Sequence, residues 1–521
     1  MVCRSLRWLV CALALAASAA HGAGPLAWFD GGRPTVDAVD TVEVLRAAVD
    51  EGLDPDDYQA AALASALARA RQDAPLPAAE QSQVDAALTA AAARYLADVQ
   101  RGRVDPRQLH SSFPVIRRAP AGGSAVLHEA LANRRVAQAL RDAQPRLPMY
   151  ASLRDALARY RALADDPAWQ VALPPLPGRK VMPGQRYAGL PLLAQRLAAL
   201  GDLPPDGPVP ARLEGALVPA LQAFQERHGL APDGVLGPAT LQQLNVPPAR
   251  RARQIELALE RLRWTPFMQG PRMIVINAPE FVLRAYEVND GRIDVHLAMR
   301  VIVGKAMRNR TPLLGEDLRS IEFSPYWNVP PSIARAETVP RLRRDPGYLQ
   351  REGLEFVTAS GQVVTTVSAA NLDAVLHGGW RIRQRPGPRN ALGGVKFVFP
   401  NGEDIYLHDT PARQLFGRAR RDFSHGCIRV EAPVSLAQFA LQGEPGWSEE
   451  RIREAMALGT PSTVALRRPI PVLIAYSTVV VRGGKVFFYP DLYREDALLE
   501  RALRLRSDTA PGSFPTSRTP G

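Results

Sequence analysis

The sequence predicts a multidomain α+β protein with a helical N-terminal scaffold, a small three-helix module and a mostly β domain that carries an insertion. Three observations support this fold class. The chain has 521 residues, enough for two to four domains that each bury a core. Apolar residues recur at helical spacing as far as Trp264 and at strand spacing after it. A proline-rich stretch, residues 169–184, separates two helical regions as a linker.

The first 24 residues have the layout of a secretory signal. Arg4 and Arg7 precede an apolar run at residues 8–17, which is shorter than the ~20 residues needed to span a bilayer. Small residues follow, and cleavage after Ala19 or Ala23 fits the pattern. We therefore expect an exported protein. The alternative is an uncleaved anchor that associates the protein with the inner membrane.

Cys3 and Cys11 lie in this segment, so the exported chain would keep Cys427 alone. In an oxidising compartment a second cysteine could be captured in a disulfide, whereas a single one stays available as a thiol. The cysteine content therefore favours a reactive role for Cys427. It also argues against a structural zinc site, which needs several cysteine or histidine ligands at short spacing. No metal and no cofactor are expected.

The formal net charge of +12 does not by itself indicate a nucleic-acid partner. Lysine occurs only at positions 180, 305, 396 and 485, so nearly all the positive charge is arginine in a chain rich in alanine and proline. This pattern indicates a compositional habit rather than a binding patch, and we expect no nucleic acid as a partner. An anionic polymer outside the cell would be attracted by such a surface.

Residues 35–168 are expected to form the helical scaffold domain. Val42, Leu45 and Val49 recur at helical intervals, and Gly52 ends that helix. Further helices are predicted over residues 59–71, 82–100, 125–143 and 150–164. No cluster of polar residues stands out in this region, which favours a scaffold role.

Residues 185–247 are expected to form the three-helix module. The stretch Phe224–Asn245, FQERHGLAPDGVLGPATLQQLN, resembles the peptidoglycan-binding type 1 module, in which an F-Q helix end, a D-G-x-x-G turn and a T-x-x-x-L helix recur. The resemblance implies binding to the cell wall. A spacer without binding is the alternative, since turn chemistry alone explains Asp233 and Gly234.

The mostly β domain is expected over residues 265–468, after a charged helix at 247–264. The predicted strands cover residues 272–279, 281–288, 294–304 and 320–330. Residues 333–385 form an insertion, which is a candidate lid because long loops beside a site often exclude water or clamp a substrate. Strands and a helix are predicted at 469–505, and a disordered tail rich in proline, serine and threonine at 506–521.

The stretch His408–Val430 holds the residues best suited to chemistry. A thiol is a strong nucleophile as its thiolate, and a nearby imidazole can take its proton. His408 ends a short predicted strand, and the fifteen residues between it and Ser424 are enough to bring Cys427 back beside it. His425 is expected to point elsewhere. The alternative is a buried structural cysteine near two histidines.

This stretch resembles the signature of the YkuD-type L,D-transpeptidase catalytic domain: a histidine, a gap, then [ST]-H-G-C, a hydrophobic residue and Arg or Asn. The residues that match are His408, Ser424, His425, Gly426, Cys427, Ile428 and Arg429. Ser324–Ala334 and Gly387–Asn401 resemble segments of the large YcbB-like members. GLDPDDY (52–58) and YLADVQRGRVDP (95–106) resemble their N-terminal scaffold, and the insertion resembles their capping subdomain.

Cys427 is accordingly predicted to be the nucleophile and His408 the proton donor and acceptor. Backbone N–H groups of residues 425–427 are candidates to hold a developing oxyanion. For the other ring nitrogen of His408 we expect a backbone carbonyl near this turn, because Asp409 is expected to point away. Arg429 either binds a substrate carboxylate or braces the loop. The remaining predictions are supporting roles for Ser424, His425, Gly426 and Arg429, and substrate binding by Tyr406, Asn390 and Trp327.

The resemblance implies a periplasmic enzyme that acts on peptidoglycan stem peptides in cell-wall biogenesis. It would cut a tetrapeptide stem between the third residue, diaminopimelate, and the terminal D-Ala. The acyl group would then pass to the side-chain amine of a neighbouring stem and give a 3-3 cross-link. An acceptor lysine on an outer-membrane lipoprotein is an alternative, and other cell-wall synthesis proteins are candidate partners. Two rival functions stay open: an L,D-carboxypeptidase or endopeptidase, and a non-catalytic wall-binding scaffold.

Overall fold

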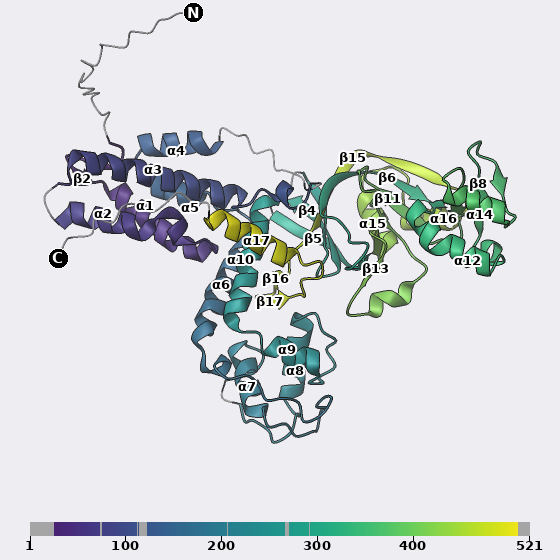
Figure 1. Cartoon of the computed structure of the whole chain (residues 1–521), viewed down its shortest axis with the longest axis horizontal. Helices are drawn as coiled ribbons and strands as arrows, with labels where there is room; N and C mark the ends of the chain where they lie inside the picture. The colour runs from purple at the N-terminus through teal and green to yellow at the C-terminus, as the bar shows by residue number, and fades with distance from the viewer. Residues whose placement is uncertain are drawn as a thin grey trace, which may run out of the picture.

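The computed structural model describes residues 26–72, 75–111, 113, 122–205, 207–265, 270–290 and 292–508. The predicted secretory segment lies outside these residues, as does the predicted tail from residue 509 onward. The described chain forms a helical region, a small helical module and a large mixed sheet with an insertion at its far end (Figure 1). The predicted multidomain α+β fold class is therefore confirmed.

The N-terminal helices pack around one apolar core that is rich in alanine, which lets the helices approach closely. A short strand pair, β1 (Phe29–Asp30) and β2 (Arg33–Pro34), precedes them, and the side chain of Thr35 caps the first helix by accepting from the N–H of Ala38. The helices are α1 (Val36–Arg46), α2 (Ala60–Gln72), α3 (Ala78–Arg101), α4 (Gly122–Ala132) and α5 (Val136–Asp142).

A buried polar network joins this region to α6 (Pro148–Ala162) and α10 (Pro248–Trp264). Glu51 accepts a hydrogen bond from the Tyr150 hydroxyl at 2.8 Å. Arg263, 1% exposed, donates to the Tyr150 hydroxyl and to Glu260, at 2.9 Å each. The sequence showed no polar cluster in this region because these residues lie far apart along the chain. Buried charges need such partners, so the network specifies how the scaffold sits on α10.

The small helical module shares its core with neighbouring elements. Its helices are α7 (Leu190–Ala199), α8 (Leu217–Arg227) and α9 (Pro238–Leu244). The core also includes apolar residues of α6, α10 and a C-terminal hairpin, β16 (Val479–Arg482) with β17 (Lys485–Phe488). The α6 helix lies inside the predicted scaffold range, yet it packs here: the rings of Tyr160 and Phe488 meet edge to face at 5.1 Å.

The mostly β region is a nine-stranded sheet in the order β13-β5-β14-β12-β11-β6-β15-β3-β4. β4 also pairs with β5, so the sheet closes on itself and leaves few free edges. The strands are β3 (Arg272–Asn277), β4 (Val282–Asn289), β5 (Arg292–Gly304), β6 (Leu314–Phe323), β11 (Val395–Val398), β12 (Leu407–His408), β13 (Asp422–Ser424), β14 (Ile428–Val430) and β15 (Ser462–Ala475).

The C-terminal segment completes this sheet and its core. β15 crosses the predicted boundary at residue 468 and pairs with both β6 and β3. α17 (Glu495–Asp508) packs Leu499 and Leu503 into the same core, and it continues three residues into the predicted tail. α15 (Pro433–Ala440) and α16 (Glu449–Ala457) add further buried side chains to that core. β15 and α17 are thus part of the sheet domain's packing, whereas the β16–β17 hairpin packs with the helical module.

The insertion has a core of its own. Its four-stranded sheet, in the order β7-β10-β8-β9, contains β7 (Trp327–Asn328), β8 (Leu354–Val357), β9 (Val363–Val364) and β10 (Arg381–Gln384). Its helices are α11 (Pro331–Ile333), a π-helical turn (Ala334–Thr338), α12 (Val339–Arg344), α13 (Tyr348–Arg351) and α14 (Ala369–Leu376). β6 and β7 replace the single predicted strand at 320–330, because Ser324 between them adopts a positive φ of 46°.

Candidate active site

Polar side chains form a row across four neighbouring strands. β12 and β14 pair in parallel and set His408 opposite Arg429. β11 sets Lys396 opposite His408, and β6 sets Glu322 opposite Lys396. Residues that face each other across paired strands point to the same side of a sheet, so these four side chains share one face. We call Arg429, His408, Lys396 and Glu322 the polar row.

Cys427 lies one residue before β14, beside the polar row. Its thiol donates weakly to the carbonyl of Asp404 at 3.6 Å. The backbone N–H and the hydroxyl of Tyr406 both interact with the sulfur. Burial raises the pKa of the thiol, whereas the Tyr406 groups and the Lys396 ammonium act to lower it. In the resting protein the thiol therefore keeps its proton at neutral pH and needs a base.

His408 has the protonation state of such a base. The ring is 4% exposed, and its Nδ1 lies 2.5 Å from the backbone carbonyl of Asp409. A carbonyl only accepts, so Nδ1 carries the hydrogen and Nε2 keeps its lone pair. Burial, together with the charge of Arg429, lowers the pKa of the ring to about 3. The imidazole is therefore neutral and able to accept a proton.

The acceptor for His408 is a backbone carbonyl, but not one from the turn at residues 424–427 as we expected. Two carbonyls of that turn already have donors. The Ser424 hydroxyl donates to the Cys427 carbonyl at 2.6 Å, and the Thr311 hydroxyl donates to the Gly426 carbonyl at 2.7 Å. Asp409 supplies the acceptor because its carbonyl adjoins the ring.

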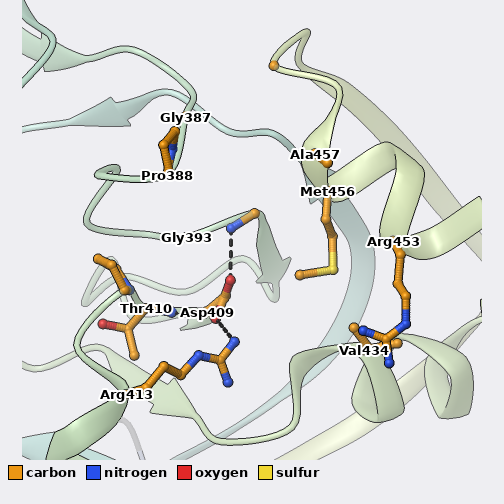
Figure 2. A pocket seen from close by; sticks show the side chains of 13 residues that line it. Gly387, Pro388, Gly393, Asp409, Thr410, Arg413, Val434, Arg453, Met456 and Ala457 are labelled. Atoms are coloured by element: carbon orange, nitrogen blue, oxygen red, sulfur yellow. Dashed lines mark hydrogen bonds and ion pairs between the residues drawn. The ribbon is translucent and has the colours of Figure 1, made fainter.

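Asp409 connects this carbonyl to an open hollow of about 510 Å³ (Figure 2). Its carboxylate accepts from the N–H groups of Gly394 at 2.9 Å and Thr410 at 2.6 Å, and it pairs with Arg413 at 2.6 Å. The carboxylate thus points away from His408, as expected. These three contacts hold the peptide unit that orients the His408 ring.

Ser424 and Gly426 give the cysteine turn its shape. The Ser424 hydroxyl accepts from the Gly426 N–H at 3.2 Å while it donates to Cys427. Gly426 has a φ of +123°, which a residue with a side chain rarely adopts. Because the Gly426 N–H already donates to the Ser424 hydroxyl, the N–H groups of His425 and Cys427 are the better candidates to hold an oxyanion.

His425 faces the insertion. Its Nε2 lies 2.7 Å from Oε1 of Glu337, which belongs to the π-helical turn. Sequence reasoning missed Glu337, since residues 333–385 carry no pattern that would distinguish it. The contact brings the insertion against the turn that holds Cys427.

Arg429 has no hydrogen bond or ion pair within the described residues, and its Nε is buried. Burial lowers the pKa of the guanidinium. A charged group that braces a loop would bond to it, so of the two roles left open the geometry favours a waiting site for an anionic substrate group.

Two predicted substrate-binding residues have other surroundings. Asn390 is 1% exposed, donates to the carbonyls of Pro325 and Arg385 at 3.0 Å each and accepts from the Leu392 N–H at 2.8 Å. These bonds show that the Asn390 amide braces a loop, and its substrate-binding role stays a prediction. Trp327 is partly buried and packs against the insertion core, where its role stays a prediction.

Lys396 and Glu322 were also missed by sequence reasoning. The rarity of lysine could have drawn attention to Lys396, but only the strand register shows that this lysine, one of four, lies opposite His408. Within the described residues, no group of three His, Cys, Asp or Glu side chains could hold a metal ion. None of the helices in this described part of the chain has the length and apolarity needed to span a membrane.

Comparison with protein families matches three parts of the chain. Residues 271–457 match the L,D-transpeptidase catalytic domain, known as YkuD. Residues 186–244 match a "Putative peptidoglycan binding domain", and residues 20–157 match a scaffold domain.

One curated relative, a "Putative L,D-transpeptidase" of Haemophilus influenzae, is 34% identical over 253 residues. The match covers 48% of this chain and 49% of the relative, so the chain spans about half the relative's length. Among solved structures, that of Bdellovibrio bacteriovorus Bd1075 is similar at 12% identity and a TM-score of 0.16, over 45% of this chain and 56% of that one. A likeness this weak bears on neither fold nor site.

Proposed function

We propose, from the match of residues 271–457 to the L,D-transpeptidase catalytic domain, that the chain forms 3-3 cross-links in peptidoglycan through a Cys427 acyl-enzyme. The observation that carries the proposal is the state of His408. Its Nδ1 hydrogen is held by the Asp409 carbonyl, which leaves the Nε2 lone pair able to accept a proton. The strand of His408 pairs with β14, which Cys427 directly precedes. A neutral base beside a protonated thiol is the pair that acyl transfer needs.

In the first half-reaction, His408 Nε2 takes the thiol proton and the sulfur attacks the carbonyl of the bond before the terminal D-Ala. A carbon–sulfur bond forms, and the amides of His425 and Cys427 stabilise the oxyanion. The carbon–nitrogen bond then breaks, and His408 returns the proton to the departing D-Ala amine.

In the second half-reaction, the side-chain amine of a neighbouring stem attacks the thioester. A new carbon–nitrogen bond forms as His408 takes a proton from that amine. The carbon–sulfur bond then breaks, and His408 returns the proton to the sulfur, which restores the thiol. Arg429 would bind a carboxylate of the donor stem, because its guanidinium has no partner within the described residues. The insertion, in contact with the cysteine turn through Glu337, would cover the donor.

The other parts of the chain fit work on the cell wall. The matched peptidoglycan-binding domain implies peptidoglycan as substrate and a location outside the cytoplasm. We propose the periplasm, with the module holding the enzyme on the polymer. A neighbouring stem peptide is the proposed acceptor, and a lysine on an outer-membrane lipoprotein is the alternative.

Incubation of the purified chain with disaccharide tetrapeptides, followed by mass spectrometry, tests the proposal. We expect dimers that have lost one D-Ala. Tripeptides without dimers would assign the enzyme as an L,D-carboxypeptidase instead. No change with the wild-type chain would leave a wall-binding scaffold. The Cys427→Ala variant is the matched control, and any product it forms would contradict the acyl-enzyme.

A further inference from the structure

The polar row contains a lysine that the reaction above does not use. Lys396 lies between His408 and Glu322 in the register of the strands. Its Nζ is 3.3 Å from Oε2 of Glu322 and 4.6 Å from the centre of the Tyr406 ring. The ammonium is therefore held over the face of the aromatic ring by a carboxylate, with about a fifth of its side chain exposed.

Tyr406 links the Lys396 ammonium to the sulfur of Cys427. Its backbone N–H and its hydroxyl both interact with Cys427, and its ring meets the His408 ring nearly edge to face at 5.7 Å. Burial raises the pKa of the Tyr406 hydroxyl, so it remains a donor. Any group that fixes the plane of this ring also fixes the hydroxyl against the sulfur.

We propose that Lys396 is a positioning residue for the Cys427 thiolate. Its ammonium holds the Tyr406 ring in place and adds a positive charge on the side of the sulfur, and Glu322 holds and moderates that ammonium. The proposal rests on the proposed function only in that Cys427 reacts as a thiolate.

The residue type supports this role. The chain supplies almost all its positive charge as arginine, yet it has lysine here. An ammonium is a compact point charge, whereas a guanidinium is a planar fork that would pair with the Glu322 carboxylate through two hydrogen bonds. A lysine can therefore face the ring and the carboxylate together.

The charges around the sulfur predict the direction in which each substitution should shift the pKa of the thiol. Lys396 lowers the pKa of the thiol and Asp404 raises it, while Glu322 raises the pKa of the Tyr406 hydroxyl. Lys396 also lowers the pKa of His408. Loss of Lys396 should therefore raise the pKa of the thiol, and loss of the Glu322 charge should lower it. Charged and titratable groups from several elements face this cluster. They are Asp404 and Tyr406 from the loop before β12, His408 from β12, Lys396 from β11, Glu322 from β6 and Arg429 from β14.

The test is the rate at which iodoacetamide alkylates Cys427 in the full chain between about pH 6 and about pH 10, since only the thiolate reacts. Peptide mapping confirms the site. We expect Lys396→Met to shift the profile to higher pH and to slow alkylation at pH ~7 about three- to tenfold. Glu322→Gln should shift the profile the opposite way, and Lys396→Arg should recover part of the rate.

Lys485→Met is the matched control, because Lys485 is an exposed lysine on the β16–β17 hairpin. Its profile should equal that of the wild type. A wild-type profile for Lys396→Met would overturn the proposal. So would slower alkylation in Glu322→Gln, since a merely structural ion pair predicts the same direction for both partners. If Lys396→Met fails to fold, the alkylation profiles of Glu322→Gln and Lys396→Arg test the proposal in its place. Alkylation requires no stem peptide, so a wild-type chain that alkylates normally but forms no dimers would refute the proposed function alone.

Discussion

At the residue scale, burial acts in opposite directions on Cys427 and His408, and both effects keep the pair uncharged. It raises the pKa of the thiol and lowers that of the imidazole to about 3. A neutral pair avoids the cost of two charges in largely buried surroundings. In the proposed mechanism the thiolate forms when His408 accepts the proton, so both residues should be needed for acylation.

We expect His408→Gln to change how stability depends on pH. The pKa of folded His408 lies near 3, below the ~6.5 of an unfolded histidine, so the unfolded chain binds a proton that the folded chain does not. The contribution of His408 to stability is complete above about pH 6.5 and is lost as the pH falls toward 3. At pH ~4.5 the wild type should have lost about 2–3 kcal/mol that the variant keeps.

Urea unfolding at neutral pH and at pH ~4.5 measures this difference. His377→Gln removes an exposed histidine of the insertion and should behave as the wild type. Equal acid sensitivity in His408→Gln and the wild type would refute the buried neutral ring.

At the scale of the elements, the site depends on loops that hold short strands in register. β12 has two residues, and the peptide unit that orients His408 is held through Asp409 by the loop before β11. Gly393 in that loop has a φ of +61°, and a side chain there would come 2.3 Å from Asp409 Oδ2. The insertion adds a second contact, from Glu337 to the cysteine turn.

Gly393→Ala should therefore displace Asp409 and misalign His408. We expect acylation of Cys427 to slow at least about tenfold, because a small misplacement of a catalytic group is costly. Gly378→Ala is the control: its φ is +77°, but no atom lies within 4 Å of the added carbon. It carries the backbone strain of about 1–2 kcal/mol without the collision. Equal rates in the two variants would show that Asp409 does not position the ring.

Glu337→Gln should loosen the insertion without unfolding it. Glu337 is 55% exposed and His425 29%, so this pair contributes at most about 1 kcal/mol. Hydrogen exchange should rise in residues 334–338 and 424–427 and nowhere else. Unchanged exchange in both segments would mean that the pair does not hold the insertion to the turn.

At the scale of the whole molecule, the parts are joined by shared cores. The helical module packs against α6, α10 and the C-terminal hairpin, so deletion of residues 186–246 would expose Phe488 and Tyr160. The wall-binding role is therefore better tested by point substitutions than by deletion. The scaffold is attached differently, through the buried ions around Arg263.

Arg263→Met should destabilise the protein by about 3–5 kcal/mol, because it removes a fully buried guanidinium from Glu260, which keeps only Arg103 as a charged partner, and from the Tyr150 hydroxyl. Arg253→Met on the same helix is the control. Its guanidinium is about one-third exposed and pairs with Glu256 and Glu500, so the expected loss is at most about 1 kcal/mol. Urea unfolding followed by circular dichroism compares the two. Equal losses would indicate that the buried network is not what joins the scaffold to α10.

The order of helices and strands, the multidomain fold class and the stretch that carries Cys427 could all be predicted from the sequence. They depend on local periodicity, turn residues and a short motif. The polar row could not be predicted, because Arg429, His408, Lys396 and Glu322 come together only through the register of four strands. Three further features likewise depend on tertiary contacts. They are the carbonyl that accepts from His408, the hydrogen bonds of the Asn390 amide to its loop, and the network around Arg263. A pattern in sequence records which face a residue turns to the core, whereas only tertiary packing decides which polar groups meet there and which pKa values burial shifts.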